Sequence, residues 1–271
     1  EKDMIIKELL HKYSTEGISQ EDIEEVLSDI QELIDNNLLY SDDPYENIAG
    51  QLKVKQSKLK ALCLHVAHGC NMDCEYCFAG KGEYNNKSGL MSLDVGKRAL
   101  DFLVENSEGR KNLEVDLFGG EPLLNWDVCK EVVRYGRALE KKHNKKFNFT
   151  LTTNGLLIDD DVIEFSNKEM GNVVLSMDGR REVHDRMRHV KTGGSSYDKI
   201  IENFKKLVES RDGRQYYMRG TYTAYNKDFA EDVIHMADMG FKETSIEPVV
   251  GDSNVPYALK DEYLEEIYEQ Y

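Results

Sequence analysis

The sequence predicts an α/β protein with a parallel sheet, preceded by a small helical unit. From Lys58 onward, extended and helical patterns alternate, as they do where crossover helices join parallel strands. Before that point the pattern is helical and very acidic. The 271 residues are enough for one large α/β domain and a small appendage. We therefore predict two domains, at residues 1–56 and 57–271.

Six strand–helix units are predicted in the larger domain. Its strands are expected at residues 60–67, 112–118, 146–153, 172–177, 215–223 and 243–250. Its helices are expected at 92–106, 125–142, 159–169, 196–210 and 228–239, with a last one from about residue 260. Six units are too few for a closed eight-stranded barrel.

Polar residues recur at alternate positions along these strands, so the period of two places them on one face. They are Glu114, Asp116, Asn148, Thr150, Thr152, Asn154, Ser176, Asp178, Arg219, Thr221, Thr223, Ser245 and Glu247. Burying such groups without partners is costly. The pattern predicts a face that holds a polar ligand, and a face open to water is the alternative.

Composition narrows the class of protein. The formal net charge of −16 argues against nucleic acid or an anionic membrane surface as a partner. No apolar run approaches the length of a membrane span, and no signal peptide is recognisable. Five cysteines, three of them clustered, suit a reducing compartment better than a disulfide framework. We predict a cytoplasmic protein.

The cysteine cluster is a CxxxCxxC run formed by Cys70, Cys74 and Cys77, directly after the first predicted strand. A [4Fe–4S] cluster normally takes four thiolates, so three would leave one iron open to a ligand that is not protein. A zinc site completed by His65 or His68 is the alternative, although zinc sites usually come as paired CxxC units.

The run, with the aromatic Tyr76 before its last cysteine, resembles the signature of radical S-adenosylmethionine (SAM) enzymes. The resemblance implies that Cys70, Cys74 and Cys77 bind one [4Fe–4S] cluster and that SAM chelates the open iron. In that family the reduced cluster cleaves SAM to methionine and a 5′-deoxyadenosyl radical. The resemblance also implies that the six units form an open (β/α)6 partial TIM barrel.

A Gly-Gly-Glu turn, Gly119, Gly120 and Glu121, ends the second predicted strand and resembles the family's GGE motif. Glycines let backbone approach a ligand closely, and the glutamate can offset the positive charge of the SAM amino group. An ordinary turn is the alternative, but ligands bind at this edge of such sheets.

The other candidate SAM-contact residues are Tyr76, Phe78, Thr152, Asn154, Ser176, Asp178 and Arg219. Thr152 and Asn154 belong to a turn frequent in the family, and Ser176 to a position that contacts SAM there. A buried Arg219 would need an anion, either the SAM carboxylate or a protein carboxylate such as Glu247.

The sequence also predicts where four further residues lie. His184 and Arg188 lie in a charge-rich segment after the fourth strand, and we expect them to shape the mouth of the site. Cys63 and Cys129 are expected in the core, since free cysteine packs as a small hydrophobe.

The stretch 63–82 resembles maturases of SCIFF peptides, which form thioether cross-links in small cysteine-rich ribosomal peptides. The resemblance implies a cysteine-rich precursor peptide with a leader as substrate, and an electron donor such as flavodoxin or ferredoxin. A sulfatase-maturase-like enzyme or another radical SAM peptide cyclase is the alternative. A catalytically silent fragment that binds a leader peptide is a third possibility.

The amino-terminal helices resemble part of the winged-helix domains that bind leader peptides along a sheet edge. Ser19 can cap the second helix, whose apolar residues begin at Ile23. No strand pattern precedes these helices, and a plain helical cap on the larger domain is the alternative. No cysteine follows Cys129, so we expect the C-terminal auxiliary-cluster domain of the relatives to be absent and the chain to be a fragment with one cluster.

Overall fold

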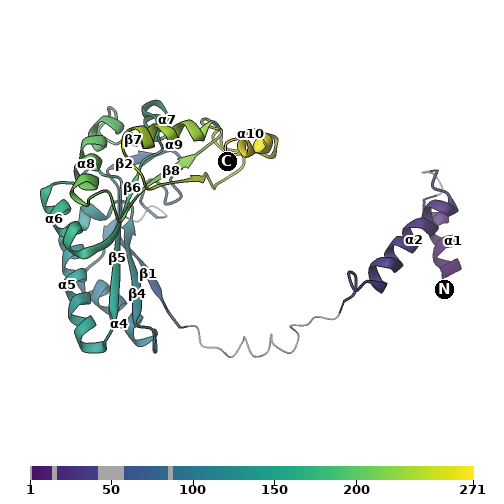
Figure 1. Ribbon diagram of the computed structural model, residues 1–271, viewed down its shortest axis with the longest axis horizontal. Helices are drawn as coiled ribbons and strands as arrows, with labels where there is room; N and C mark the ends of the chain where they lie inside the picture. The colour runs from purple at the N-terminus through teal and green to yellow at the C-terminus, as the bar shows by residue number, and fades with distance from the viewer. Residues whose placement is uncertain (1, 14–16, 42–57, 85–87) are drawn as a thin grey trace. The chain divides into compact units, whose positions relative to one another are not determined.

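The computed structural model describes residues 2–13, 17–41, 58–84 and 88–271 (Figure 1). The chain divides into two units, residues 1–57 and 58–271, and each is described by itself. The predicted domain boundary between residues 56 and 57 lies outside the described residues.

The first unit contains two helices, α1 (Lys2–Lys12) and α2 (Gln20–Asp35). Ser19 caps α2, because its hydroxyl accepts from Asp22 N and the Asp22 carboxylate accepts from Ser19 N. On α2 Ile23 is buried, whereas Val26 and Leu33 are exposed. The described residues of this unit include no strand, and the resemblance to a leader-binding domain stays a prediction.

The second unit is built on six parallel strands that neighbour one another in chain order. These strands are β1 (Ala61–His68), β4 (Asn112–Gly119), β5 (Lys146–Thr153), β6 (Met170–Ser176), β8 (Tyr216–Tyr222) and β9 (Thr244–Pro248). The short β3 (Gly89–Leu90) adds to β1 in the antiparallel sense. In the described part of the chain β9 pairs only with β8, so the sheet is not closed there.

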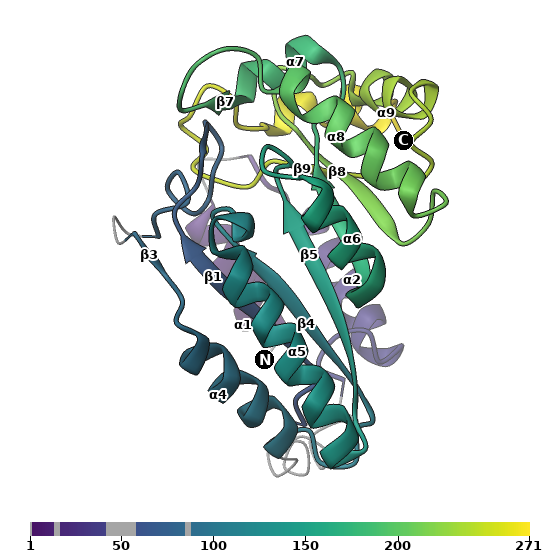
Figure 2. The same ribbon diagram turned by 90° about the vertical axis from the view of Figure 1, so that its left-hand side faces the viewer.

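Helices follow the strands and cover one face of the sheet, as Figure 2 shows for α4, α5, α6 and α8. The helices are α4 (Leu93–Glu105), α5 (Trp126–His143), α6 (Asp160–Glu169), α8 (Tyr197–Ser210), α9 (Phe229–Asp238) and α10 (Leu264–Tyr268). Two single 3₁₀ turns, η1 (Pro122–Asn125) and η2 (Asp261–Tyr263), precede α5 and α10. The predicted strands and helices are confirmed, with ends that differ by a few residues.

The hydrophobic core lies between the sheet and these helices. Along β4, Leu113, Val115 and Leu117 are buried, whereas Glu114 is exposed and Asp116 is half-buried. Strand β5 shows the same alternation. The predicted polar face is therefore confirmed, and it is the face turned away from the helices.

A two-stranded ribbon was not predicted from the sequence. It pairs β2 (Met72–Cys74) with β7 (Arg188–Val190) in the antiparallel sense, and helix α7 (Arg181–Met187) leads into it. Each of these strands has three residues, too few to show a period of two. The ribbon matters because β2 carries Cys74.

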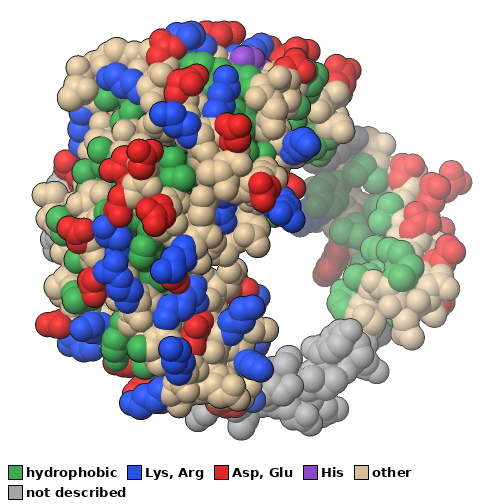
Figure 3. Space-filling view, turned by 60° about the vertical axis from the view of Figure 1, so that its left-hand side comes forward, with side chains coloured by type: hydrophobic (Ala, Val, Ile, Leu, Met, Phe, Trp, Pro, Cys, Tyr) green, Lys and Arg blue, Asp and Glu red, His purple; other side chains and the backbone are tan. Residues whose placement is uncertain are grey.

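Charged side chains of both signs intermingle over the surface of this unit, and Figure 3 shows one face of it. No described helix combines the length and the apolar character that crossing a membrane requires.

Candidate active site

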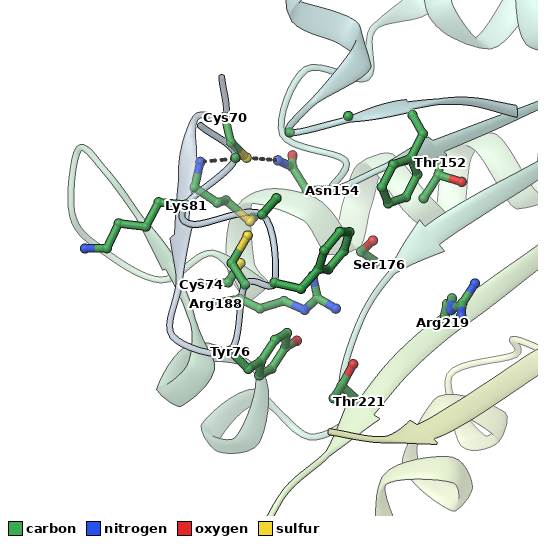
Figure 4. A pocket seen from close by; sticks show the side chains of 18 of the residues that line it. Cys70, Cys74, Tyr76, Lys81, Thr152, Asn154, Ser176, Arg188, Arg219 and Thr221 are labelled. Atoms are coloured by element: carbon green, nitrogen blue, oxygen red, sulfur yellow. Dashed lines mark hydrogen bonds between the residues drawn. The ribbon is translucent and has the colours of Figure 1, made fainter. Parts of the chain in front are cut away.

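A cavity of about 630 Å³ lies at the carboxyl ends of the parallel strands (Figure 4). Most of the predicted site residues line it: Cys70, Cys74, Tyr76, Cys77, Phe78, Gly119, Gly120, Thr152, Asn154, Ser176 and Arg219. The structure thus brings together side chains from the cysteine run and from four strand ends, which lie far apart in the sequence. Two predicted site residues, Glu121 and Asp178, do not line the cavity.

The cysteine run leaves β1 and returns through β2, so its sulfurs lie beside the strand ends. The Cys70 sulfur accepts from Met72 N at 3.4 Å and from Asn154 Nδ2 at 3.5 Å. A turn closed by Cys77 N, which donates to Cys74 O at 3.2 Å, sets the spacing of the other two cysteines.

The donor set fits an iron–sulfur cluster better than a single zinc ion. Among the described residues, no three His, Cys, Asp or Glu side chains are grouped as ligands of one metal ion. A four-iron cluster instead takes at most one protein thiolate on each iron. Three thiols that face one cavity would bind three of the irons and leave the fourth open. Burial raises the pKa of Cys74 to about 12, so its thiol keeps its proton until a cation displaces it.

The Gly-Gly-Glu turn holds the cysteine run from behind. Gly120 N donates to Ala67 O at 2.8 Å, and Glu121 N donates to Gly69 O at 2.9 Å. A Cβ on Gly120 would lie 2.1 Å from Gly69 O, so the two backbones can approach only because this residue is glycine. The close contact that requires glycine here is with the chain itself.

The Glu121 side chain, a predicted SAM contact, is directed into the protein rather than into the cavity. Its side chain is fully buried and accepts from Leu123 N at 3.0 Å, Thr153 Oγ1 at 2.8 Å and Asn154 N at 2.8 Å. Burial outweighs these bonds and raises the pKa of Glu121 to about 7. Glu121 therefore braces the turn that carries Asn154, one layer behind the cavity wall.

The Asp178 side chain, another predicted cofactor contact, is also directed into the protein. The Asp178 carboxylate is fully buried and accepts from Tyr76 OH at 2.5 Å and from Thr221 N at 3.0 Å. It also accepts from Arg188 Nε at 3.1 Å and Arg188 Nη2 at 3.0 Å. Asp178 thus ties the cysteine run to β7 and β8, because four different segments meet at this one carboxylate.

The family follows from this geometry together with the sequence match. Residues 64–239 match the family described as the radical SAM superfamily. The chain belongs to the radical SAM superfamily. Members of this superfamily use a [4Fe–4S] cluster and SAM, and its partial barrel fold is the one described above.

The chain matches only part of the length of its named relatives. The chain is 32% identical over 158 residues to a cysteine-type anaerobic sulfatase-maturating enzyme of Clostridium perfringens, covering 55% of this chain and 41% of the enzyme. It is 24% identical over 188 residues to the radical SAM cyclopropyl synthase TigE of Paramaledivibacter caminithermalis, covering 64% of this chain and 39% of TigE. The chain spans about two fifths of the length of these relatives.

A solved structure described as native anSMEcpe with bound AdoMet and Cp18Cys peptide shares the fold. The TM-score is 0.68 at 22% identity, and the match covers 78% of this chain and 58% of that one.

Arg188 is the most deeply buried of the cations that line this cavity, which also include Lys81 and Arg219. Its side chain is almost fully buried, lines the cavity and lies with its guanidinium 5.4 Å from the centre of the Tyr76 ring. Burial disfavours the charge of Arg188, but nearby groups, the Asp178 carboxylate foremost, outweigh burial and raise its pKa, so it stays charged. The sequence offered only a weak signal, because Arg188 follows Arg180, Arg181 and Arg186 in a segment that looks solvated.

The surroundings of Arg219 and Cys63 can also be compared with those predicted from the sequence. Arg219 pairs with Glu247 at 2.5 Å, and both side chains are about half exposed, so the protein carboxylate is its partner here. Cys63 is exposed on the polar face of the sheet, and its predicted place in the core is wrong because β1 turns it away from the helices. Cys129 is buried as predicted.

Proposed function

We propose that this radical SAM enzyme forms a thioether cross-link in a ribosomal peptide, as in SCIFF maturation. The observation that carries the proposal is the cavity in which three cysteines, two glycines and Arg188 face one another. It is large enough for a cofactor the size of SAM, since small-molecule sites measure about 300–1,000 Å³.

The chain's own residues would hold the cofactors as follows. Cys70, Cys74 and Cys77 would bind one [4Fe–4S] cluster, and the exposed ring of Phe78 would cover an adenine. Arg188 would attract the SAM carboxylate. When bound, the two groups supply a 5′-deoxyadenosyl radical, the hydrogen-abstracting species of this superfamily.

A peptide is the substrate class that the relatives favour. Sulfatase-maturating enzymes are among them, and the anSMEcpe structure is described with a bound peptide. Forming the thioether removes two hydrogens from the peptide in total, one as the abstracted atom and one as a thiol proton with an electron. The electrons would be exchanged with a small protein such as flavodoxin or ferredoxin.

A sulfatase-maturase-like activity is the second candidate, favoured by the 32% identity to such an enzyme. It differs in its product, because oxidation of a single cysteine leaves no cross-link. A third candidate, a silent leader-binding fragment, predicts peptide binding without SAM cleavage.

The test uses the full chain, reconstituted anaerobically with iron and sulfide and reduced with dithionite. We expect SAM-dependent release of 5′-deoxyadenosine and, with a cysteine-rich precursor peptide, a product that lacks two hydrogens and no longer reacts with alkylating agents at one cysteine. Cys70→Ser should lose cluster iron and cleavage, whereas Cys63→Ser, outside the run, should retain both. A chain that binds peptide yet releases no 5′-deoxyadenosine would contradict the proposal.

A further inference from the structure

Of the three predicted cluster ligands, Cys70 has the sulfur that accepts the most hydrogen bonds from N–H groups of the protein. It accepts from Met72 N and from Asn154 Nδ2, whereas among the described contacts the sulfurs of Cys74 and Cys77 accept no N–H group. As a thiol, the Cys70 sulfur donates to Asn71 Oδ1 at 3.8 Å. As an iron-bound thiolate it would keep only its two N–H donors, and such donors suit that charged form. One of these donors is backbone, and the other is a side chain that can be removed.

The orientation of Asn154 is fixed by its surroundings. Its Oδ1 accepts from Leu156 N at 3.1 Å, a group that can only donate, so the amide nitrogen must point the other way. That nitrogen carries two hydrogens. One is directed at Asn71 Oδ1 at 2.7 Å, and the other at the Cys70 sulfur at 3.5 Å (Figure 4). Its backbone N donates to Glu121 at 2.8 Å, and the residue is 7% exposed.

Every polar atom of the Asn154 side chain is therefore used by the chain itself. The sequence predicts a SAM contact for this residue, but both amide hydrogens are directed at the cysteine run. What remains is an N–H group of a buried side chain, held against the sulfur of a predicted cluster ligand.

We propose that Asn154 is a positioning residue that raises the reduction potential of the cluster bound at Cys70. Reduction adds one electron from an external one-electron donor and no proton, so the cluster and its sulfurs become more negative. An N–H donor stabilises that reduced state more than the oxidised one, as hydrogen bonds to the sulfurs do in iron–sulfur proteins. The inference rests on the proposed function, because it requires the cluster.

The test is an EPR-monitored redox titration of the anaerobically reconstituted full chain, without SAM or peptide. Asn154→Asp keeps the acceptor for Leu156 N and removes the N–H donor. Asn154→Ser adds no charge and replaces the amide N–H group with a hydroxyl on a side chain too short to take its place against the sulfur. We expect the ratio of reduced to oxidised cluster at a fixed potential to fall about fivefold in Asn154→Ser, and further in Asn154→Asp.

The matched control is Asn203→Ala. Asn203 Nδ2 donates to Gly155 O at 3.0 Å, so this change removes an asparagine bond to the same turn without touching the sulfur. Its potential should equal that of the wild type. A shift of the same size in this control would show that turn stability acts, and would overturn the inference.

Three other outcomes would also overturn it. They are unchanged potentials in both Asn154 variants, a shift in Asn154→Asp alone, and loss of the cluster from both variants while the control keeps it. Absence of a cluster from the wild type would instead defeat the proposed function.

Discussion

At the scale of single residues, the site rests on a buried ion pair. Asp178 is fully buried, and its partner Arg188 is exposed only where it reaches the cavity. Removing one member of a buried pair strands the other charge in a medium of low polarity, which costs more than the pair contributes. Exposed pairs contribute little, because water already screens both charges.

Asp178→Asn should therefore lower the free energy of unfolding by about 3–5 kcal/mol, because Arg188 loses its counter-charge. Chemical denaturation of the apo-protein measures the change. The control is Glu247→Gln, which breaks the half-exposed pair with Arg219 and should cost about 1 kcal/mol or less. Equal losses in the two variants would show that Asp178 is not the anchor described above.

His184 should make the free energy of unfolding depend on pH. It is fully buried, and its Nδ1 accepts from Asp178 N at 3.3 Å. Burial lowers the pKa of His184 from 6.5 to about 4. The Arg188 charge acts in the same direction, whereas the Asp178 and Asp185 carboxylates oppose the shift. Between these two pH values the unfolded chain binds a proton that the folded chain does not, so stability falls as pH falls.

The expected contribution is a loss of about 1.4 kcal/mol for each pH unit below 6.5, down to about pH 4. Glu121 opposes it, because its raised pKa makes its own contribution fall as pH rises from 4.5 to about 7. The measurement is thus the difference in unfolding free energy between wild type and His184→Asn, which keeps an acceptor for Asp178 N. That difference should shrink from pH 7 to pH 5, and parallel curves would refute it.

Residue identity was easier to predict than residue depth. The motifs led to Cys70, Cys74 and Cys77, which do share one cavity. The same motifs suggested that Glu121 and Asp178 touch the cofactor, yet both lie behind the wall. Side-chain pattern indicates which strand end a residue occupies, but the twist of the following turn decides whether it faces the cavity or the protein.

At the scale of elements, the turn after β4 supports the cysteine run through backbone contact. Gly120→Ala should weaken cluster retention by about tenfold or more, because the new Cβ would meet Gly69 O and push the run outward. Iron and acid-labile sulfide per chain, measured after gel filtration, report the loss.

Gly69→Ala is the matched control for this change. It lies in the same contact, but a Cβ there meets no atom within 4 Å, so cluster content should stay at the wild-type level. Equal loss in both variants would contradict the steric explanation.

Local patterns predicted the long elements and missed the short ones. Helices α4, α5, α6, α8 and α9 carry continuous apolar stripes. Strands β4, β5 and β8 alternate buried and more exposed side chains over seven or eight residues. Strands β2 and β7 have three residues each and exist because they pair with one another. Their pairing depends on tertiary structure, so no window of sequence contains it.

At the scale of the whole molecule, we propose that the first unit recognises the peptide's leader while the barrel does the chemistry. The exposed Val26 and Leu33 lie about two turns apart on α2 and therefore on the same side. Val26→Asp with Leu33→Asp should weaken leader-peptide binding by about tenfold or more and leave SAM cleavage without peptide unchanged.

Fluorescence anisotropy with a labelled leader measures the affinity. Glu25→Gln, also exposed on α2, is the control and should bind as the wild type does. Unchanged affinity in the double variant would favour the plain helical cap.

The ribbon of β2 and β7 also constrains the order in which this protein can be made. Tyr76 and Asp178 are joined by a hydrogen bond although 102 residues separate them. A ribosome releases the cysteine run long before it releases β7, so the run emerges without the strand that will hold it. Because contacts between distant parts of a chain form late and slowly, the three thiols stay unconstrained during much of synthesis. Cluster loading should therefore follow the release of α7 and β7, and oxidants present before that point should find the cysteines unprotected.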